Sequence, residues 1–209
     1  MTTLAALIQA LAFLGTIALT LGVLAVALVA AMRGSRTWAR RGVAAALGVP
    51  LAYAAVLLAV GLLSDDRAIP PGATKAFCEF DCHVVYDIDA ASVAPDGMVK
   101  VTVREPFDPA SISPRRGDAP LTPGGRRFAL IDDAGRAWAP AARHDLDATP
   151  LFGPLRPGES QRAELTFRLP AAVRPRGLLV EPDDPVSPFL IGHERSPFHG
   201  KTLLTLPVG

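Results

Sequence analysis

Charged side chains are almost absent from the first 63 residues of this 209-residue chain. This part holds no acidic residue and only four arginines, all between residues 33 and 41. Two uncharged runs remain, residues 4–32 and 43–63, and each is longer than the roughly 20 residues that a helix needs to cross a membrane. The scarcity of charge therefore predicts a hairpin of two transmembrane helices over residues 1–63.

A cleaved signal peptide is the alternative for the first run. Signal peptides begin with basic residues and contain an apolar core of about 7–15 residues. Met1–Thr3 contains no basic side chain, and the apolar run that follows is about twice too long. We therefore expect the first run to persist as a helix.

The four arginines predict an orientation. Loops rich in Arg and Lys stay on the cytoplasmic side of a membrane, so the loop of residues 33–42 is expected in the cytoplasm. Both termini are then extracytoplasmic, and the protein is integral to a bacterial inner or plasma membrane, with the lipid bilayer as a partner. A linker over residues 64–72 is expected to lead to an outer domain over residues 73–209.

The rest of the chain lacks a basic stripe. It contains 17 Lys and Arg against 20 acidic residues, so nucleic acid is not an expected partner. It also lacks a long amphipathic helix, and it contains 19 of the 20 prolines. Apolar and polar residues alternate with period two in residues 84–89, 99–104 and 163–169, as expected for half-buried strands.

Turn signals separate these segments. Pro95–Gly97 predicts a hairpin turn between the first two strands, and Asp132–Gly135 predicts a second one, with Gly135 left-handed. Further short strands are expected at residues 177–181, 186–191 and 202–206, and residues 106–126 are expected to form a long surface crossover. Many short strands with regular turns are typical of an all-β sandwich or barrel.

A resemblance narrows this choice. Three stretches, residues 127–138, 155–160 and 163–170, are similar to the immunoglobulin-like envelope domains of bacterial lipoproteins and membrane-anchored proteins of unassigned function. The similarity covers about residues 73–208. It implies an envelope location and an all-β immunoglobulin-like sandwich, so the expected fold class is two transmembrane helices followed by this sandwich. It transfers no catalytic residue, because such a sandwich supports many functions.

Cysteine is scarce, and both cysteines lie in one stretch, Cys78-Glu-Phe-Asp-Cys82-His83. Outside the cytoplasm two cysteines usually pair. In an extended strand the Cα atoms of Cys78 and Cys82 would be about 13 Å apart, whereas a disulfide requires less than about 7 Å. A disulfide between Cys78 and Cys82 therefore requires the segment to turn.

A metal site is the alternative for this stretch. Thiolate and imidazole groups suit copper or zinc, and Cys78, Cys82 and His83 are candidate ligands together with His193 or His199. We expect residues 77–83 to pack against the loop of residues 192–200, so that these side chains share a pocket. Covalent haem on the Cys-x3-Cys-His motif is a third reading, although nothing else in the sequence suggests a cytochrome.

The layout also resembles subunit II of cytochrome oxidase, which has two spans, a β-domain and a dicopper centre with two cysteines four residues apart. In that family the cysteines come near the end of the domain, and a histidine follows the second cysteine by four residues. Tyr86 occupies this position here, so the ligands are not carried over.

The sequence predicts a protein without catalytic residues. The pair His193-Glu194 lacks a second histidine at the helical spacing of four that a zinc protease needs. We expect a two-helix anchor that presents a sandwich to another envelope protein or steadies a membrane complex. The alternative function is copper handling or electron transfer at the Cys-x3-Cys-His stretch, and a hydrolytic enzyme is a distant third.

Overall fold

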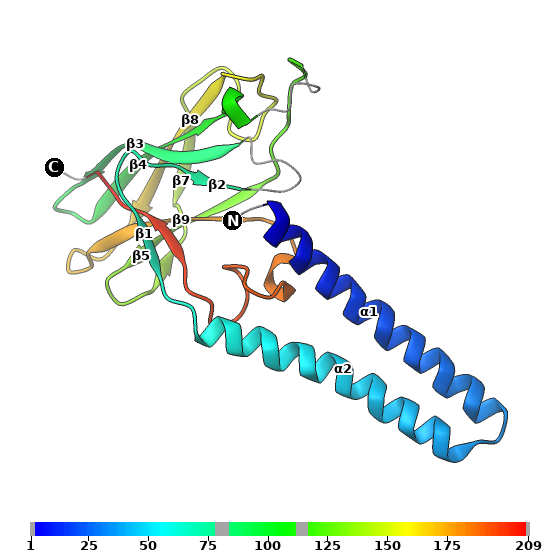
Figure 1. Ribbon diagram of the computed structural model, residues 1–209. Helices are drawn as coiled ribbons and strands as arrows, with labels where there is room; N and C mark the ends of the chain where they lie inside the picture. The colour runs from blue at the N-terminus through cyan, green and yellow to red at the C-terminus, as the bar shows by residue number, and fades with distance from the viewer. Residues whose placement is uncertain (1–2, 78–83, 112–116, 208–209) are drawn as a thin grey trace. The chain divides into compact units, whose positions relative to one another are not determined.

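The computed structural model describes residues 3–77, 84–111 and 117–207 (Figure 1). The chain divides into two compact units. The helical unit contains Leu4–Asp65 and Val186–Gly200. The sandwich unit is built mainly from Asp66–Pro185 and from the chain that begins at Lys201. Residues 186–200 thus fold with the helices, although they lie between two strands of the sandwich in the sequence.

Both uncharged runs form helices, as predicted. Helix α1 covers Thr3–Met32 and α2 covers Arg36–Leu62, and both are long and apolar enough to cross a membrane. They approach closely near the turn that joins them, where a Cβ atom on Gly42 would lie 2.6 Å from Cβ of Ala27. Figure 1 shows the helices diverging from this turn. Glycine at position 42 therefore permits the tight end of the hairpin.

The sandwich unit contains two five-stranded sheets. The first has the order β1 (Arg67–Ile69), β10 (Thr202–Leu204), β9 (Pro175–Pro182), β5 (Arg126–Asp132) and β6 (Ala137–Trp138). The second has the order β2 (Lys75–Ala76), β3 (Val85–Val93), β4 (Met98–Pro106), β8 (Ser160–Arg168) and β7 (Ala142–Asp145). Among the described strands, only β1 and β10 pair in parallel.

The strand order is that of an immunoglobulin-like sandwich. In that fold one sheet has the order A-B-E-D, and the other contains G-F-C, extended by C′ in variable-type domains. With β3 as strand A and the remaining strands lettered in chain order, β3-β4-β8-β7 and β10-β9-β5-β6 reproduce both orders. The predicted fold class of two helices followed by an all-β sandwich is confirmed.

The core lies between the two sheets. Val99, Val101 and Val103 of β4 are buried, as are alternate residues of β8, and they pack against Leu130 and Leu178 of the other sheet. The period-two alternation therefore identifies the buried face correctly. Both predicted turn glycines have positive φ, +84° at Gly97 and +76° at Gly135.

Two segments differ from the expectation. The predicted strand at residues 186–191 is wrong, because Ser187–Phe189 forms the 3-10 helix η2, in which Pro188 has no N–H to donate to a strand neighbour. Arg67–Ile69, in the segment expected to be a linker, pairs with β10 as strand β1. A further 3-10 helix, η1, covers Pro109–Ser111 inside the expected crossover.

Candidate functional site

Three of the predicted site residues, Cys78, Cys82 and His83, lie outside the described residues. The disulfide, the metal site, the haem attachment and the packing of residues 77–83 against residues 192–200 therefore stay predictions. On the described flanks, the N–H of Phe77 donates to the carbonyl of Val84 at 3.4 Å. Within the described parts of the chain, no group of three or more His, Cys, Asp or Glu side chains is arranged to hold a metal ion.

His193 and His199 both lie in the helical unit. Nδ1 of His193 accepts a hydrogen bond from the N–H of Arg195 at 3.1 Å. Nδ1 of His199 lies 2.8 Å from the carbonyl oxygen of Gly200, a distance suited to donation by the ring. Each imidazole thus uses Nδ1 to order the turns of residues 186–200.

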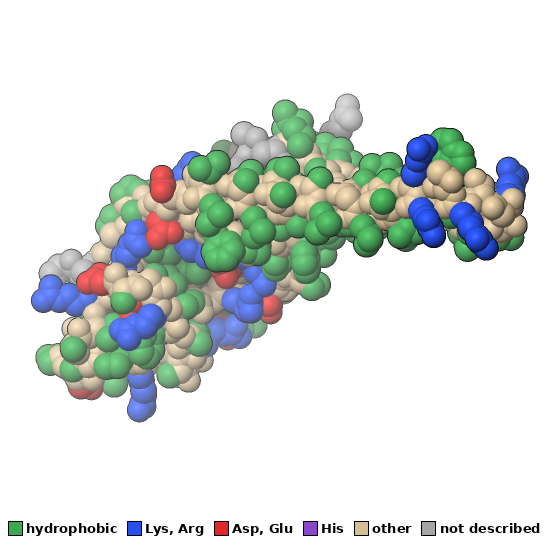
Figure 2. All heavy atoms as spheres, turned by 90° about the horizontal axis from the view of Figure 1, so that it is seen from below, with side chains coloured by type: hydrophobic (Ala, Val, Ile, Leu, Met, Phe, Trp, Pro, Cys, Tyr) green, Lys and Arg blue, Asp and Glu red, His purple; other side chains and the backbone are tan. Residues whose placement is uncertain are grey.

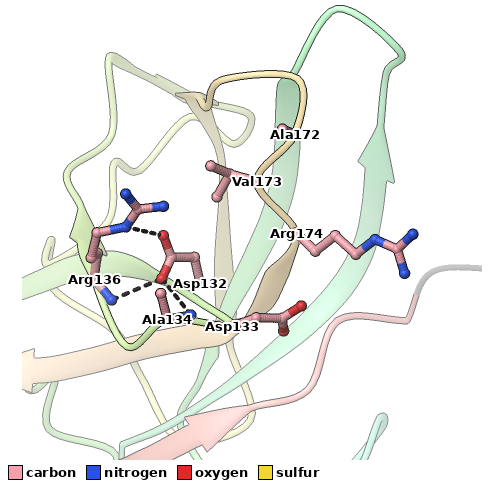
Figure 3. A pocket seen from close by; sticks show the side chains of 7 residues that line it. All are labelled: Asp132, Asp133, Ala134, Arg136, Ala172, Val173 and Arg174. Atoms are coloured by element: carbon pink, nitrogen blue, oxygen red, sulfur yellow. Dashed lines mark hydrogen bonds and ion pairs between the residues drawn. The ribbon is translucent and has the colours of Figure 1, made fainter.

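A surface cleft of about 420 Å³ lies beside the β5–β6 turn (Figure 3). Its buried carboxylate, Asp132, accepts hydrogen bonds from the N–H groups of Ala134 and Arg136 and from Nε of Arg136 and Nε1 of Trp138, at 2.8–3.0 Å. Burial of Asp132 opposes its ionisation, but these hydrogen bonds outweigh it and hold its pKa at about 2. The carboxylate shapes the turn and is unsuited to act as a base at neutral pH.

A second buried carboxylate, Glu105, lies in the core of the sandwich. It accepts hydrogen bonds from the hydroxyl of Tyr86 and, at 3.0 Å, from the N–H of Phe152. Burial raises the pKa of Glu105, and the two hydrogen bonds offset part of that rise. The alternation that buries Val101 and Val103 also places residue 105 inward, so the pattern contained a signal for this residue that our sequence analysis missed.

Lys75 completes a polar link between the two sheets. From β2 its Nζ donates to the carbonyls of Val180 in β9 and Thr202 in β10, at 2.8 and 2.9 Å. The guanidinium of Arg126 lies 4.7 Å from the ring centroid of Phe77, and Lys75 Nζ lies 5.2 Å from the same ring. These buried cations hold the sheets together.

The helical unit contains a junction of three aromatic side chains. The hydroxyl of Tyr53 in α2 donates to the carbonyl of Phe189 at 2.7 Å. The ring of Phe13 in α1 stacks on Phe189, with centroids 6.2 Å apart, and tilts against Tyr53 at 6.3 Å. Residues 136 positions apart in sequence make this junction, so no local pattern could predict it.

An apolar groove of about 360 Å³ continues from the junction between the helices. One face of α1 from Phe13 to Leu21 and one face of α2 from Pro50 to Leu57 line it. The hydroxyls of Thr16 and Thr20 donate to carbonyls of their own helix at 2.8 Å. The lining of the groove is therefore mostly apolar and suits hydrocarbon.

Residues 186–200 also contact the end of α2. A Cβ atom on Gly61 would lie 2.2 Å from the carbonyl oxygen of Pro197, so this approach requires glycine. Farther along, the N–H of Gly200 donates to Oγ of Ser64 at 2.8 Å. The segment thus contacts α2 at Tyr53 and Gly61 and contacts the chain just beyond the helix at Ser64.

Comparisons with known proteins give little further identification. No family model matches the chain, and a search of curated proteins finds no match. Among solved structures, the chain is similar to MPT63, a secreted protein from Mycobacterium tuberculosis, at 10% identity and a TM-score of 0.37. The match covers 56% of this chain and 91% of that chain. A likeness this weak supports no statement about function, and the fold assignment rests on the strand order.

Proposed function

We propose that this chain is an integral protein of a bacterial inner or plasma membrane. Its two helices anchor an extracytoplasmic immunoglobulin-like sandwich, and the sandwich binds another envelope protein or steadies a membrane complex. The observation that carries the proposal is the exposure of large apolar side chains along both helices.

This exposure distinguishes the helices from the core helices of a soluble protein. Leu14 in α1 is 59% exposed and Leu51 in α2 is 68% exposed, and many other large apolar side chains of the hairpin resemble them. Figure 2 shows hydrophobic side chains along the helical hairpin. Apolar surface of this extent is covered by a partner or a membrane in a native protein, and helices of this length match a bilayer.

The arginines support the orientation. Arg33, Arg36, Arg40 and Arg41 lie at and just after the turn between the helices, and Figure 2 shows basic side chains gathered at this end of the hairpin. The guanidinium of Arg41 lies 5.9 Å from the ring centroid of Trp38, a pairing suited to a membrane interface. A cytoplasmic turn leaves the sandwich outside the cytoplasm.

The described part of the sandwich supports binding rather than a reaction. Its three buried carboxylates serve structural roles: Asp132 orders the turn, Glu105 lies in the core, and Asp87 pairs with Arg104 at 2.6 Å. Both sheets end in short outer strands, among them β6 and β7, whose side chains are mostly exposed. Exposed outer strands can add a strand from a partner, which is one way for a sandwich to bind a protein.

Two experiments test this proposal. A reporter that is active only outside the cytoplasm should be active after Gly209 and silent between Arg36 and Arg40, and the reverse pattern would contradict the orientation. In intact cells, a membrane-impermeant cross-linker should join the sandwich to another envelope protein. If the chain is recovered only as an uncross-linked monomer, the binding role is wrong.

A further inference from the structure

We infer that Val186–Gly200 is a re-entrant segment that enters the outer half of the bilayer between the two helices and contacts lipid hydrocarbon through Phe189 and Phe198. The inference rests on the proposed function, because it requires α1 and α2 to span the membrane. It adds a third membrane-embedded element that hydrophobic runs alone do not reveal.

The contacts with α2 give the depth of the segment. Gly200 is bonded to Ser64, just beyond the end of α2, whereas the carbonyl of Phe189 is bonded to Tyr53. Tyr53 lies nine residues before Leu62, so at a rise of about 1.5 Å per residue it is about 13 Å from the end of the helix. In a hydrocarbon core of roughly 30 Å, Phe189 therefore lies close to the midplane.

The contacts with α1 follow the same order along the helix. Phe13, which stacks on Phe189, lies four residues further into α1 than Gln9, which is about 6 Å along the axis. Gly192 lies near the helix ends, since a Cβ atom there would be 3.3 Å from Nε2 of Gln9 and 3.8 Å from Val60. Both helices thus place Phe189 deeper than Gly192.

Tight turns pair part of the backbone of the segment within the protein. Irregular backbone at membrane depth is tolerated where its polar groups are paired within the protein. A series of tight turns supplies this pairing. At the deepest point, the hydroxyl of Tyr53 donates a hydrogen bond to the carbonyl of Phe189. The N–H groups of Phe189, Leu190, His193, Ser196 and His199 donate to the carbonyls of Val186, Ser187, Leu190, His193 and Ser196 at 2.9–3.2 Å.

The exposed side chains of the segment suit lipid. Phe189 is 54% exposed and Phe198 is 71% exposed, and Phe198 has a φ of +62°, a conformation that is unfavourable for a bulky residue. In water these rings would leave apolar surface uncovered, whereas in the bilayer hydrocarbon covers it. The charged residues Glu194 and Arg195 come two and three residues after Gly192, which places them near the headgroups.

Quenching by brominated lipid tests the inference on the full chain. Phe189→Trp, Leu14→Trp and Leu146→Trp are each made in a Trp38→Phe, Trp138→Phe background, so that each variant contains one tryptophan. Each variant is reconstituted in phosphatidylcholine vesicles. Leu14 is an exposed residue of α1, and Leu146 is 43% exposed directly after β7. We expect lipid brominated at mid-chain to quench Phe189→Trp about as strongly as Leu14→Trp and to leave Leu146→Trp unchanged.

The controls separate the two proposals. If Leu14→Trp is quenched and Phe189→Trp behaves like Leu146→Trp, the re-entrant segment is wrong and the membrane hairpin stands. If Leu14→Trp is not quenched either, both are wrong. Phe198→Trp provides a second measurement should Phe189→Trp fail to fold. Lipid brominated near the headgroup should quench it more than lipid brominated mid-chain, and no quenching by either lipid would overturn the inference.

Discussion

At the residue scale, two buried carboxylates of the sandwich, Asp132 and Glu105, have pKa values that are shifted in opposite directions. Asp132 is held ionised by donors on the β5–β6 turn, whereas burial makes Glu105 hold its proton to a higher pH than an exposed glutamate. Both residues are hydrogen-bonded, so the difference arises from the number and charge of the donors. Asp132 has four donor groups including a guanidinium, whereas Glu105 has two neutral donors, and the charge of Arg126 lowers its pKa less than either of them does.

Glu105 should make the sandwich less stable as the pH rises. Its pKa in the folded state is raised above the ordinary 4.5, so between these two values the folded state binds more protons than the unfolded chain. The free energy of unfolding then falls as the pH rises through this window. Denaturant unfolding of the Trp38→Phe chain in detergent, followed by Trp138 fluorescence, should show this slope, and Glu105→Gln should remove it. An unchanged slope in the variant would assign the effect to other groups.

Tyr86→Phe should lower the free energy of unfolding at neutral pH by about 1–3 kcal/mol, because it deletes a donor to a buried carboxylate. The loss should be smaller in Glu105→Gln, and a double-mutant cycle measures that coupling. Glu164→Gln, which alters an exposed ion pair with Lys100, is the matched control and should change stability little. Equal losses for Tyr86→Phe in both backgrounds would show that the hydroxyl acts independently of Glu105.

For Asp132 we predict the opposite dependence of stability on pH. Its pKa is lowered from 3.8 to about 2 in the folded state, so its contribution to stability is complete above the ordinary value and is lost as the pH falls through about 2. Asp132→Asn should lower the melting temperature at neutral pH and leave it nearly unchanged at pH 2. A melting temperature that drops equally at both pH values would argue for a packing effect.

The disulfide between Cys78 and Cys82 stays a prediction, and counting reactive thiols tests it. For a disulfide, the denatured protein should show no reactive thiol before reduction and two afterwards. Two thiols before reduction, together with bound copper or zinc in the purified protein, would support the metal site instead.

At the element scale, the turns and the hairpin depend on glycine for different reasons. Gly97 and Gly135 both have positive φ, but a Cβ atom on Gly97 would lie 2.0 Å from the carbonyl oxygen of Leu169, whereas nothing lies within 4 Å of one on Gly135. Gly42 instead permits the contact with Ala27. The β3–β4 turn is thus constrained by both conformation and packing, and the β5–β6 turn by conformation alone.

Gly135→Ala should therefore cost about 1–2 kcal/mol, the strain of a left-handed alanine. Gly97→Ala should cost more, because the same strain is joined by a steric clash with the backbone. Denaturant unfolding of both variants measures the difference. Equal losses would mean that the chain near Leu169 moves away freely.

At the scale of the whole molecule, the sandwich unit has its own core and includes β1. Asp66, just before β1, accepts hydrogen bonds from the N–H of Lys201 and from Nη1 of Arg176, at 2.8 and 2.7 Å. The hydrogen bond from Lys201 is the main cause of the lowered pKa of Asp66. A fragment that begins at residue 73 would lose these contacts and the parallel strand.

We expect the fragment of residues 66–209 to fold alone with a β-rich circular dichroism spectrum, and a fragment of residues 73–209 to melt at a lower temperature. In the longer fragment, Phe189→Ser with Phe198→Ser should improve solubility, because the surface that we assign to the bilayer is then exposed to water. A helix-dominated spectrum, or equal melting temperatures for the two fragments, would contradict this division of the chain.

The sequence by itself determined the features that depend on neighbouring residues. The uncharged runs specify two helices, and the alternation in β4 and β8 specifies a buried face, because helix and strand periods are local properties. Turn glycines such as Gly97 and Gly135 were identifiable for the same reason. The tertiary structure alone decided the contacts between distant residues. Lys75 reaches Val180 and Thr202 because β2 comes to lie against the opposite sheet. An apolar run around Phe189 resembles a strand in sequence, and it becomes part of the helical unit because Phe13 and Tyr53, far away in the chain, provide the surface that it buries.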